Sequence, residues 1–318
     1  TTVSAVEGTY KIDKSLMLDG TADYLSRTPS SAGSTTKCTY SFWVKRSGLG
    51  DAELDILNCE THTDGQRDGI SFGDGSTADL LSVRFNDAND GHLKTNALFR
   101  DAAAWQHLVV AIDTTQGVAS NRVKIYNNGV QVTSFATETY PAKDYDMQGF
   151  MQDEKQHIGT TVAANNYWFD GYLAEFIGLD GYTGSASDFG GWDTNGNWVP
   201  IDPATTVAAN VGTNGFHLKF DASGLLGKSS ISSTNPSVSH LGSSTNGSTS
   251  TAYTFSSSSL GAAASNRTIV IAVGGGRATA GTRTVSTLTV GGSSATFIAR
   301  KNSGAGNVLE FWSIAVAS

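Results

Sequence analysis

The stretch "RVKIYNNGVQV", residues 122–132, predicts a β-hairpin. Apolar and polar side chains alternate through its first half, in the order Val123, Lys124, Ile125 and Tyr126. That alternation places successive side chains on opposite faces of a strand. Asn128 and Gly129 supply the two positive φ angles that a tight two-residue turn requires. The sequence therefore predicts two antiparallel strands joined at this turn.

Further strand patterns lie on both sides of this hairpin. The run "WQHLVVAID" (105–113) is continuously apolar, which favours a strand covered on both faces. The run "CTYSFWVKR" (38–46) alternates, with Trp43 on the face opposite to its other apolar side chains. Those side chains are Cys38, Tyr40, Phe42 and Val44. Other strands are expected at 16–27, 80–85 and 169–179. Regular strands joined by Gly, Asn and Asp turns predict a two-sheet sandwich.

Composition supports an all-β protein and excludes some partners. The chain has 318 residues, which suggests one large or two modest domains, and it holds 36 Gly but only 5 Pro. A net charge of −8 without a basic stripe argues against nucleic-acid binding. No apolar run is long enough to insert into a membrane. Cys38 and Cys59 are expected to be buried and reduced, with one disulfide between them as the alternative.

A change of composition divides the chain. Residues 229–250 are rich in Ser, Thr and Gly and predict a linker. Residues 251–318 hold five short β-runs, including "RTIVIAVGGG" and "VLEFWSIAV". Five strands are few for a closed sandwich. We therefore expect a second, smaller β-sandwich-like domain that is incomplete at its C-terminal end.

The first half resembles a laminin-G-like, concanavalin-A-type jelly roll. The resemblance rests on "YSFWVKRSG" (40–48), "AAWQHLVVAIDTT" (103–115), "NRVKIYNNGVQV" (121–132), "HIGTT" (157–161) and "FDGYLAEF" (169–176). It implies a jelly roll over 1–182 and a segment over 183–228 that packs on it. The stretches "SASDFGGWDTNGNWVPIDP" (185–203) and "GTNGFHLKFDASGLLG" (212–227) resemble the segment that follows such a module in bacteriophage structural and tail-fibre-associated proteins.

This resemblance implies a non-enzymatic virion protein without a cofactor. Such a protein would be a tail fibre, a head fibre or a capsid decoration, assembled in the bacterial host cytoplasm and lying on the virion surface. The expected partners are other virion proteins, further copies of the chain and glycans of the host surface. A purely structural spacer without a ligand is the alternative.

A second alternative is a polysaccharide depolymerase or glucanase. "ELDILNCE" (53–60) resembles the catalytic strand of jelly-roll glucanases, whose pattern is Glu-x-Asp followed by a second Glu two or three residues later. Here Asn58 stands three residues after Asp55, and the next acid is Glu60. In a regular strand Glu60 would face away from Glu53, unless a β-bulge restored the facing. We therefore expect no catalytic residues, because the general acid is missing.

Two binding sites are expected. Aromatic rings beside amides suit sugar rings, and the candidates for glycan binding are Asn165, Asn166, Tyr167, Trp168, Tyr172, Trp192 and Trp198. The alternative is that these rings pack the core or fasten the following segment to it. The acidic loop 64–75 suits calcium, with Asp64, Asp68 and Asp74 as the candidate ligands, although a solvated loop is the plainer interpretation.

Overall fold

The computed structural model describes residues 10–61, 66–161, 167–221, 267–275, 285–290, 293–303 and 307–316. The chain divides into two units, Thr1–Ser232 and Ser233–Ser318. The expected linker at 229–250 lies outside the described residues. None of the helices in the described part of the chain is long and apolar enough to cross a membrane.

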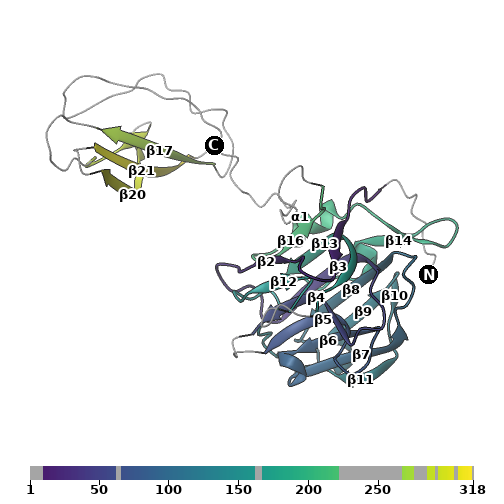
Figure 1. The fold of residues 1–318 in the computed structure, drawn as a ribbon. Coiled ribbons are helices and arrows are strands. Elements are labelled where there is room, and N and C mark those ends of the chain that lie inside the picture. Colours follow the sequence, from purple (N-terminus) through teal and green to yellow (C-terminus); the bar gives the residue numbers. More distant parts are fainter. Residues whose placement is uncertain are drawn as a thin grey trace. The chain divides into compact units, whose positions relative to one another are not determined.

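Seven strands of the first unit form one antiparallel sheet, called here the first sheet (Figure 1). They are β1 (Leu16–Asp19), β3 (Lys37–Arg46), β8 (Gln106–Asp113), β9 (Val123–Asn127), β10 (Val130–Gln131), β13 (Asp170–Asp180) and β16 (Phe216–Leu218). Their order is β1-β13-β3-β8-β9-β10, and β16 also pairs with β13. The predicted hairpin is confirmed, because β9 pairs with β10 and the turn has φ angles of 46° at Asn128 and 80° at Gly129.

Another seven strands form the second sheet of the same unit. They are β2 (Leu25–Arg27), β4 (Glu53–Glu60), β5 (Arg67–Gly73), β6 (Leu80–Phe85), β7 (Gly91–Leu98), β11 (Phe135–Thr139) and β12 (Gln156–Ile158). Their order is β11-β7-β6-β5-β4-β12-β2, and all pairs are antiparallel. The short 3₁₀ turns η1 (Asn86–Ala88) and η2 (Ala119–Asn121) lie in loops of this unit.

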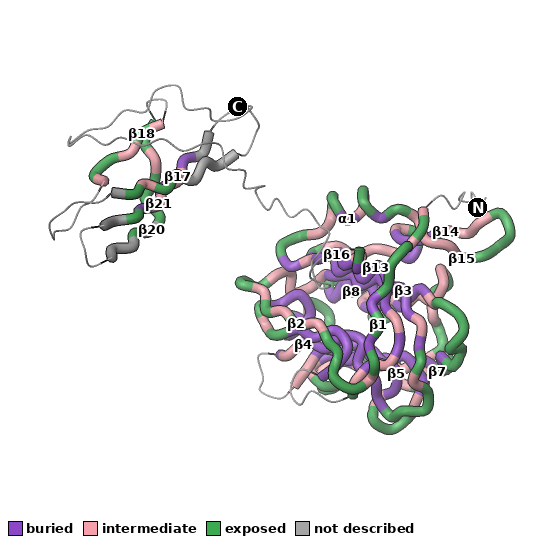
Figure 2. The backbone as a smooth tube through the Cα atoms, turned by 45° about the horizontal axis from the view of Figure 1, so that its top comes forward, coloured by how far each residue is buried: buried purple, intermediate pink, exposed green. Residues whose placement is uncertain are grey.

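The main core lies between the two sheets, where Figure 2 shows buried backbone along the strands. The inward face of β3 is the predicted one, formed by Cys38, Tyr40, Phe42 and Val44. Phe42 stacks on Phe176 of β13 with ring centroids 4.8 Å apart. Cys38 and Cys59 are buried in this core and are not bonded to each other. The all-β jelly-roll sandwich is thereby confirmed.

A smaller core covers the outer face of the first sheet. The covering segment contains η3 (Ala186–Asp188), β14 (Gly190–Trp192), β15 (Trp198–Pro200) and α1 (Ala204–Asn210). Its apolar side chains pack on those that β8 and β13 turn outward. The buried members of this cluster are Val109, Ile177, Leu179, Ala186, Phe189 and Val207. The segment after the sandwich is therefore part of the same unit.

The second unit contains a three-stranded antiparallel sheet of order β17-β21-β20. Its strands are β17 (Arg267–Gly275), β20 (Thr296–Ser303) and β21 (Asn307–Val316). A separate pair is formed by β18 (Thr289–Val290) and β19 (Ser293–Ser294). A second, smaller β-structure is therefore present in the described part of residues 251–318.

Candidate functional site

A β-bulge in β4 decides which side chains face outward from the second sheet. Asp55 pairs with Ser71 of β5, whereas Leu57 pairs with the adjacent Ile70, so Ile56 is the extra residue. The apolar side chains before and after the bulge both reach the core, namely Leu54, Ile56, Leu57 and Cys59. Glu53, Asp55, Asn58 and Glu60 therefore share the outer face. Glu60 was expected to face away from Glu53 in a regular strand, and the structure instead has the alternative, a β-bulge that restores the common face.

Two arginines hold the acidic side chains of this face. Arg67 of β5 contacts Glu53 Oε1 through Nη2 at 2.9 Å and Asp55 Oδ2 through Nη1 at 3.2 Å. Arg84 of β6 contacts the same Oε1 of Glu53 at 2.7 Å. Glu53 is only 5% exposed and Asp55 only 1%. We call the surface formed by Glu53, Asp55, Asn58, Arg67 and Arg84 the Arg67 face.

Asp55 is the most perturbed acid of the Arg67 face. Burial raises its pKa to about 7, although Arg67 favours the charged form. Its Oδ2 accepts hydrogen bonds from Thr161 Oγ1 at 2.9 Å and from Asn58 Nδ2 at 3.2 Å. Its Oδ1 is buried and has no hydrogen-bond partner among the described residues. Asp55 can therefore hold a proton near neutral pH, but protein donors already fill its other oxygen.

Three aromatic side chains border the Arg67 face. The backbone of Tyr167 and Trp168 runs beside β4, where Asp55 N donates to Tyr167 O at 2.8 Å. The Arg67 guanidinium lies 5.6 Å from the centre of the Tyr167 ring. The ring centroids of Tyr24 and Trp168 are 5.8 Å apart. Tyr24 and Tyr167 are each 40% exposed. This border combines apolar ring faces with charged and amide groups.

The other predicted glycan residues lie elsewhere. Tyr172 belongs to β13 of the first sheet, where its ring meets Trp105 edge-on at 6.4 Å. Trp192 and Trp198 face each other across the β14–β15 hairpin with ring centroids 5.2 Å apart. Asn165 and Asn166 lie outside the described residues. The structure thus brings Tyr167 and Trp168 to one site and separates them from the other three aromatics.

Trp198 fastens the covering segment to the first sheet. Its Nε1 donates a hydrogen bond to Nδ1 of the buried His107 at 3.0 Å. Because indole can only donate, Nδ1 accepts, and Nε2 of His107 carries the hydrogen that it donates to Ser41 Oγ at 2.9 Å. Burial lowers the pKa of His107 to about 3, so the ring is neutral. His107 therefore cannot take a proton from Ser41 and has a structural role.

The described calcium candidates are engaged separately. Asp68 is buried and accepts from three backbone amides, those of Asn86 at 2.8 Å, Gly149 at 2.9 Å and Phe150 at 3.1 Å. Asp74 binds Lys94 at 2.6 Å. Asp64 lies outside the described residues. Within the ranges that the structure describes, no group of three or more His, Cys, Asp or Glu side chains could hold a metal ion. Asp68 and Asp74 are therefore each held by protein partners, and calcium binding at this loop stays a prediction.

Sequence reasoning missed Arg67 and Tyr24. Arg67 pairs with Glu60 across the β4–β5 ladder, so its contact with Glu53 and Asp55 depends on how its long side chain extends along the strand. Tyr24 precedes β2, whose three residues are too short for a pattern. Both residues become recognisable only when the strand pairing is known.

A family model described as the concanavalin A-like lectin/glucanases superfamily matches residues 19–177, which is half of the chain. Among curated proteins, none matches this sequence.

Several solved structures are similar at low identity. One is the native heptameric SAP-like pentraxin from Limulus polyphemus, with 14% identity, 51% of this chain and 73% of that chain covered, and a TM-score of 0.38. Another is domain 4 of AbnA, a GH43 extracellular arabinanase from Geobacillus stearothermophilus, in complex with arabinotriose, with 18% identity, 58% and 78% covered, and a TM-score of 0.36. A third is the CBM40 of the Ruminococcus gnavus IT-sialidase, with 12% identity, 55% and 94% covered, and a TM-score of 0.35.

Proposed function

Because the chain belongs to the concanavalin A-like lectin/glucanases superfamily, we propose that its first unit binds carbohydrate and does not cleave it. The observation that carries this proposal is the contact between Asn58 and Asp55 on the Arg67 face. The bulge turns Asn58 to the place where the glucanase pattern has its second acid. An amide cannot give a proton to a leaving group, so that place cannot supply a general acid.

The remaining acids of β4 do not replace it. Glu60 shares the outer face, but about six residue rises of roughly 3.3 Å each, after one residue is taken up by the bulge, put its backbone roughly 20 Å from that of Glu53. A glycosidase pair needs carboxyls about 5 to 9.5 Å apart. Asp55 has the raised pKa of an acid catalyst, yet it is 1% exposed and its Oδ2 is bound by protein donors. A glycosidic oxygen therefore has no access to it.

Carbohydrate binding is supported by the border of the Arg67 face. Sugars present an apolar ring face with a rim of hydroxyls, and they bind where aromatic faces adjoin groups that form hydrogen bonds. Tyr24 and Tyr167 expose such faces beside Trp168 and the Arg67 guanidinium. We assign the glycan contact to Tyr24, Tyr167 and Trp168.

The biological setting we propose is a bacteriophage virion. The support is the sequence resemblance over residues 16–227, and the role is host-surface attachment by a tail fibre, head fibre or capsid decoration. With several copies of the chain on one particle, sites that each bind a glycan weakly would be sufficient to attach the particle to the host surface. Antibody labelling of purified particles tests this setting, and absence of the chain from the particles would contradict it.

Binding and cleavage are separated by one experiment on the purified chain. Immobilised bacterial polysaccharides and oligosaccharides are offered with and without calcium, and both retention and released reducing ends are measured. We expect retention without release, and at least about fivefold weaker retention in Tyr24→Ala and Tyr167→Ala. The matched control is Trp105→Ala, an exposed aromatic on the first sheet.

Each other outcome supports an alternative. Release that disappears in Glu53→Gln would establish a glucanase and overturn the proposal. Retention that requires calcium would return Asp68 and Asp74 to consideration as ligands. If the chain is not retained and no sugar is released, the structural spacer without a ligand is the best explanation.

A further inference from the structure

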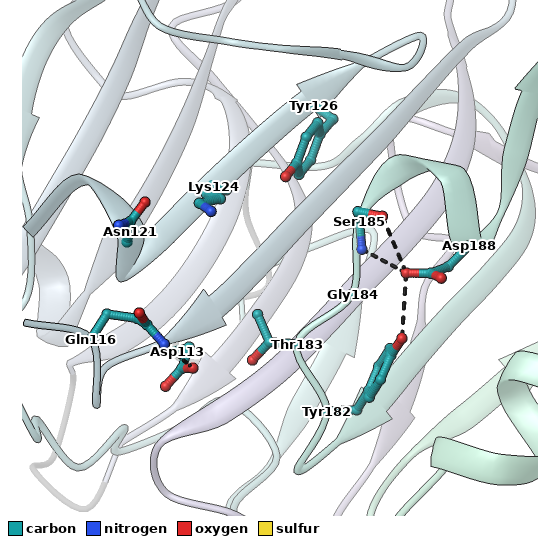
Figure 3. A pocket seen from close by; sticks show the side chains of 10 residues that line it. All are labelled: Asp113, Gln116, Asn121, Lys124, Tyr126, Tyr182, Thr183, Gly184, Ser185 and Asp188. Atoms are coloured by element: carbon teal, nitrogen blue, oxygen red, sulfur yellow. Dashed lines mark hydrogen bonds between the residues drawn. The ribbon is translucent and has the colours of Figure 1, made fainter. Parts of the chain in front are cut away.

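A pocket of about 430 Å³ opens on the first sheet, apart from the Arg67 face (Figure 3). One wall comes from β9 and the end of η2, which contribute Tyr126, Lys124 and Asn121. The other wall comes from the turn after β13, with Tyr182, Ser185 and Asp188. The volume is large enough for a small molecule, and the lining is mostly polar.

The strand pattern explains the first wall. Val123 and Ile125 belong to the main core, so the alternation of β9 turns Lys124 and Tyr126 outward. Both are half-buried. The side chains of Lys124, Tyr126 and Asn121 make no hydrogen bond or ion pair with any part of the chain that the structure describes. An ammonium group, a hydroxyl and an amide are therefore available to a ligand.

The second wall is held in place before any ligand binds. Asp188 Oδ2 accepts from the backbone N of Ser185 at 2.7 Å and, more weakly, from Tyr182 Oη at 3.5 Å. Thr183 Oγ1 donates to the backbone O of Ile112 at 3.0 Å, which ties the turn to β8. Side chains that are already ordered lose less entropy when a ligand binds. The segment that carries Thr183, Ser185 and Asp188 is therefore positioned before a ligand binds.

The charges of the pocket balance. Asp113 contacts Lys37 at 3.3 Å and accepts from Gln116 Nε2 at 2.7 Å. That leaves one carboxylate, Asp188, and one ammonium group, Lys124, on the two walls. An anionic or cationic ligand would meet no excess of the opposite charge. The pocket favours an uncharged ligand that has both hydrogen-bond donors and acceptors.

From this geometry we infer that the pocket is a second carbohydrate site, separate from the Arg67 face, that takes a neutral sugar between Tyr126 and Tyr182. The two tyrosine rings also pack against the smaller core, and their exposed parts would cover the apolar face of the sugar, while Lys124, Asn121 and Asp188 bind its hydroxyls. The ligand class rests on the proposed carbohydrate binding, whereas the existence and charge balance of the pocket do not. Two sites on opposite sheets would allow one chain to bridge two glycan branches.

The test uses the full chain on an array of neutral hexose and N-acetylhexosamine oligosaccharides and of sialylated oligosaccharides. The double variant Asn121→Ala/Lys124→Ala removes two hydrogen-bonding groups, and we expect about tenfold weaker binding to the neutral members. Tyr126→Phe removes one hydroxyl and should weaken the same members about threefold. Lys143→Ala is the control, because Lys143 is an exposed lysine whose one ion pair among the described residues is with its exposed neighbour Asp144.

The outcomes separate this inference from the proposed function. If Tyr24→Ala and Tyr167→Ala weaken binding while the pocket variants match Lys143→Ala, the pocket site is overturned and the Arg67 face stands. If the pocket variants weaken binding to sialylated members as much as to neutral ones, the neutral-sugar assignment is overturned. If the unmodified chain binds no member of the array, both proposals fail.

Discussion

Asn58 Nδ2 donates a hydrogen bond to Asp55 Oδ2 at 3.2 Å, although the two residues are three apart in one β-strand. In a regular strand they would point to opposite faces of the sheet. The bulge at Ile56 brings them to the same face. Because of the same bulge, Asp55 lies between Asn58 and Arg67. The bulge therefore positions both the buried carboxylate of Asp55 and the side-chain amide of Asn58.

Arg67→Met is expected to lower the free energy of unfolding by about 3–5 kcal/mol. Arg67 is the cation shared by Glu53 and Asp55, and removing it leaves buried carboxylates with less compensation. Urea unfolding near pH 8 measures the change. Lys143→Ala, at an exposed ion pair, should change stability by no more than about 0.5 kcal/mol. Equal effects of the two substitutions would show that the Arg67 contacts contribute little.

Asp55 should make stability fall as the pH rises. Its folded pKa is about 7, whereas an unfolded aspartate has a pKa of about 3.9. Between these values the folded state binds the extra proton, so the contribution of Asp55 is fully present below about pH 4 and is lost as the pH rises through about 7. From pH 5 to pH 8 the loss is on the order of 3 kcal/mol.

The comparison of the unmodified chain with Asp55→Asn isolates this effect. The half-buried His92 and the buried His107 have pKa values lowered to about 4 and about 3, so their contribution is lost as the pH falls below about 6.5. That loss is common to both chains and cancels in the difference of their unfolding free energies. A difference that stays constant from pH 5 to pH 8 would contradict the raised pKa of Asp55.

Local patterns were sufficient for much of the sandwich. Asn128 and Gly129 predicted the turn, because few residue pairs accept positive φ at two successive positions. The alternation of residues 38–46 predicted which side of β3 faces the core, and Trp43 lies on the opposite side, stacked on His107. Both features depend on a few neighbouring residues, so one sequence can reveal them.

The candidate sites depended on contacts that local patterns do not contain. The bulge, which was the alternative to a regular strand, has a local signal, since apolar residues stand at 54 and 56 and then at 57 and 59. Such a one-residue shift in alternation indicates a bulge. The separation of Trp168 from Trp198 had no local signal. It follows from the tertiary arrangement, because Trp168 lies beside β4 of the second sheet, whereas Trp198 lies against His107 of β8 in the first sheet.

Trp198→Phe should destabilise the first unit by about 1–3 kcal/mol. Phenylalanine keeps an aromatic ring over the first sheet but leaves Nδ1 of the buried His107 without its donor. Trp192→Phe is the matched control, because Trp192 contacts the Trp198 ring edge-on and, within the described residues, makes no hydrogen bond or ring contact with His107. We expect Trp192→Phe to lower the free energy of unfolding by about 1 kcal/mol or less. Thermal or urea unfolding of the two variants decides whether the hydrogen bond fastens the segment, and equal losses would show that ring packing alone does so.

Gly129→Ala should cost more than Gly196→Ala, and the difference measures the contact between the hairpin turn and Trp198. Both glycines have a φ of 80°, so an alanine at either position loses about 1–2 kcal/mol through backbone strain. At Gly196 a new Cβ would meet none of the described residues within 4 Å, whereas at Gly129 it would clash with Cε3 of the Trp198 ring. Moving that ring also disturbs its bond to His107, so we expect an additional loss of about 1–3 kcal/mol. Urea unfolding of both variants gives the comparison, and equal losses would mean that Trp198 does not lie over the β9–β10 turn in solution.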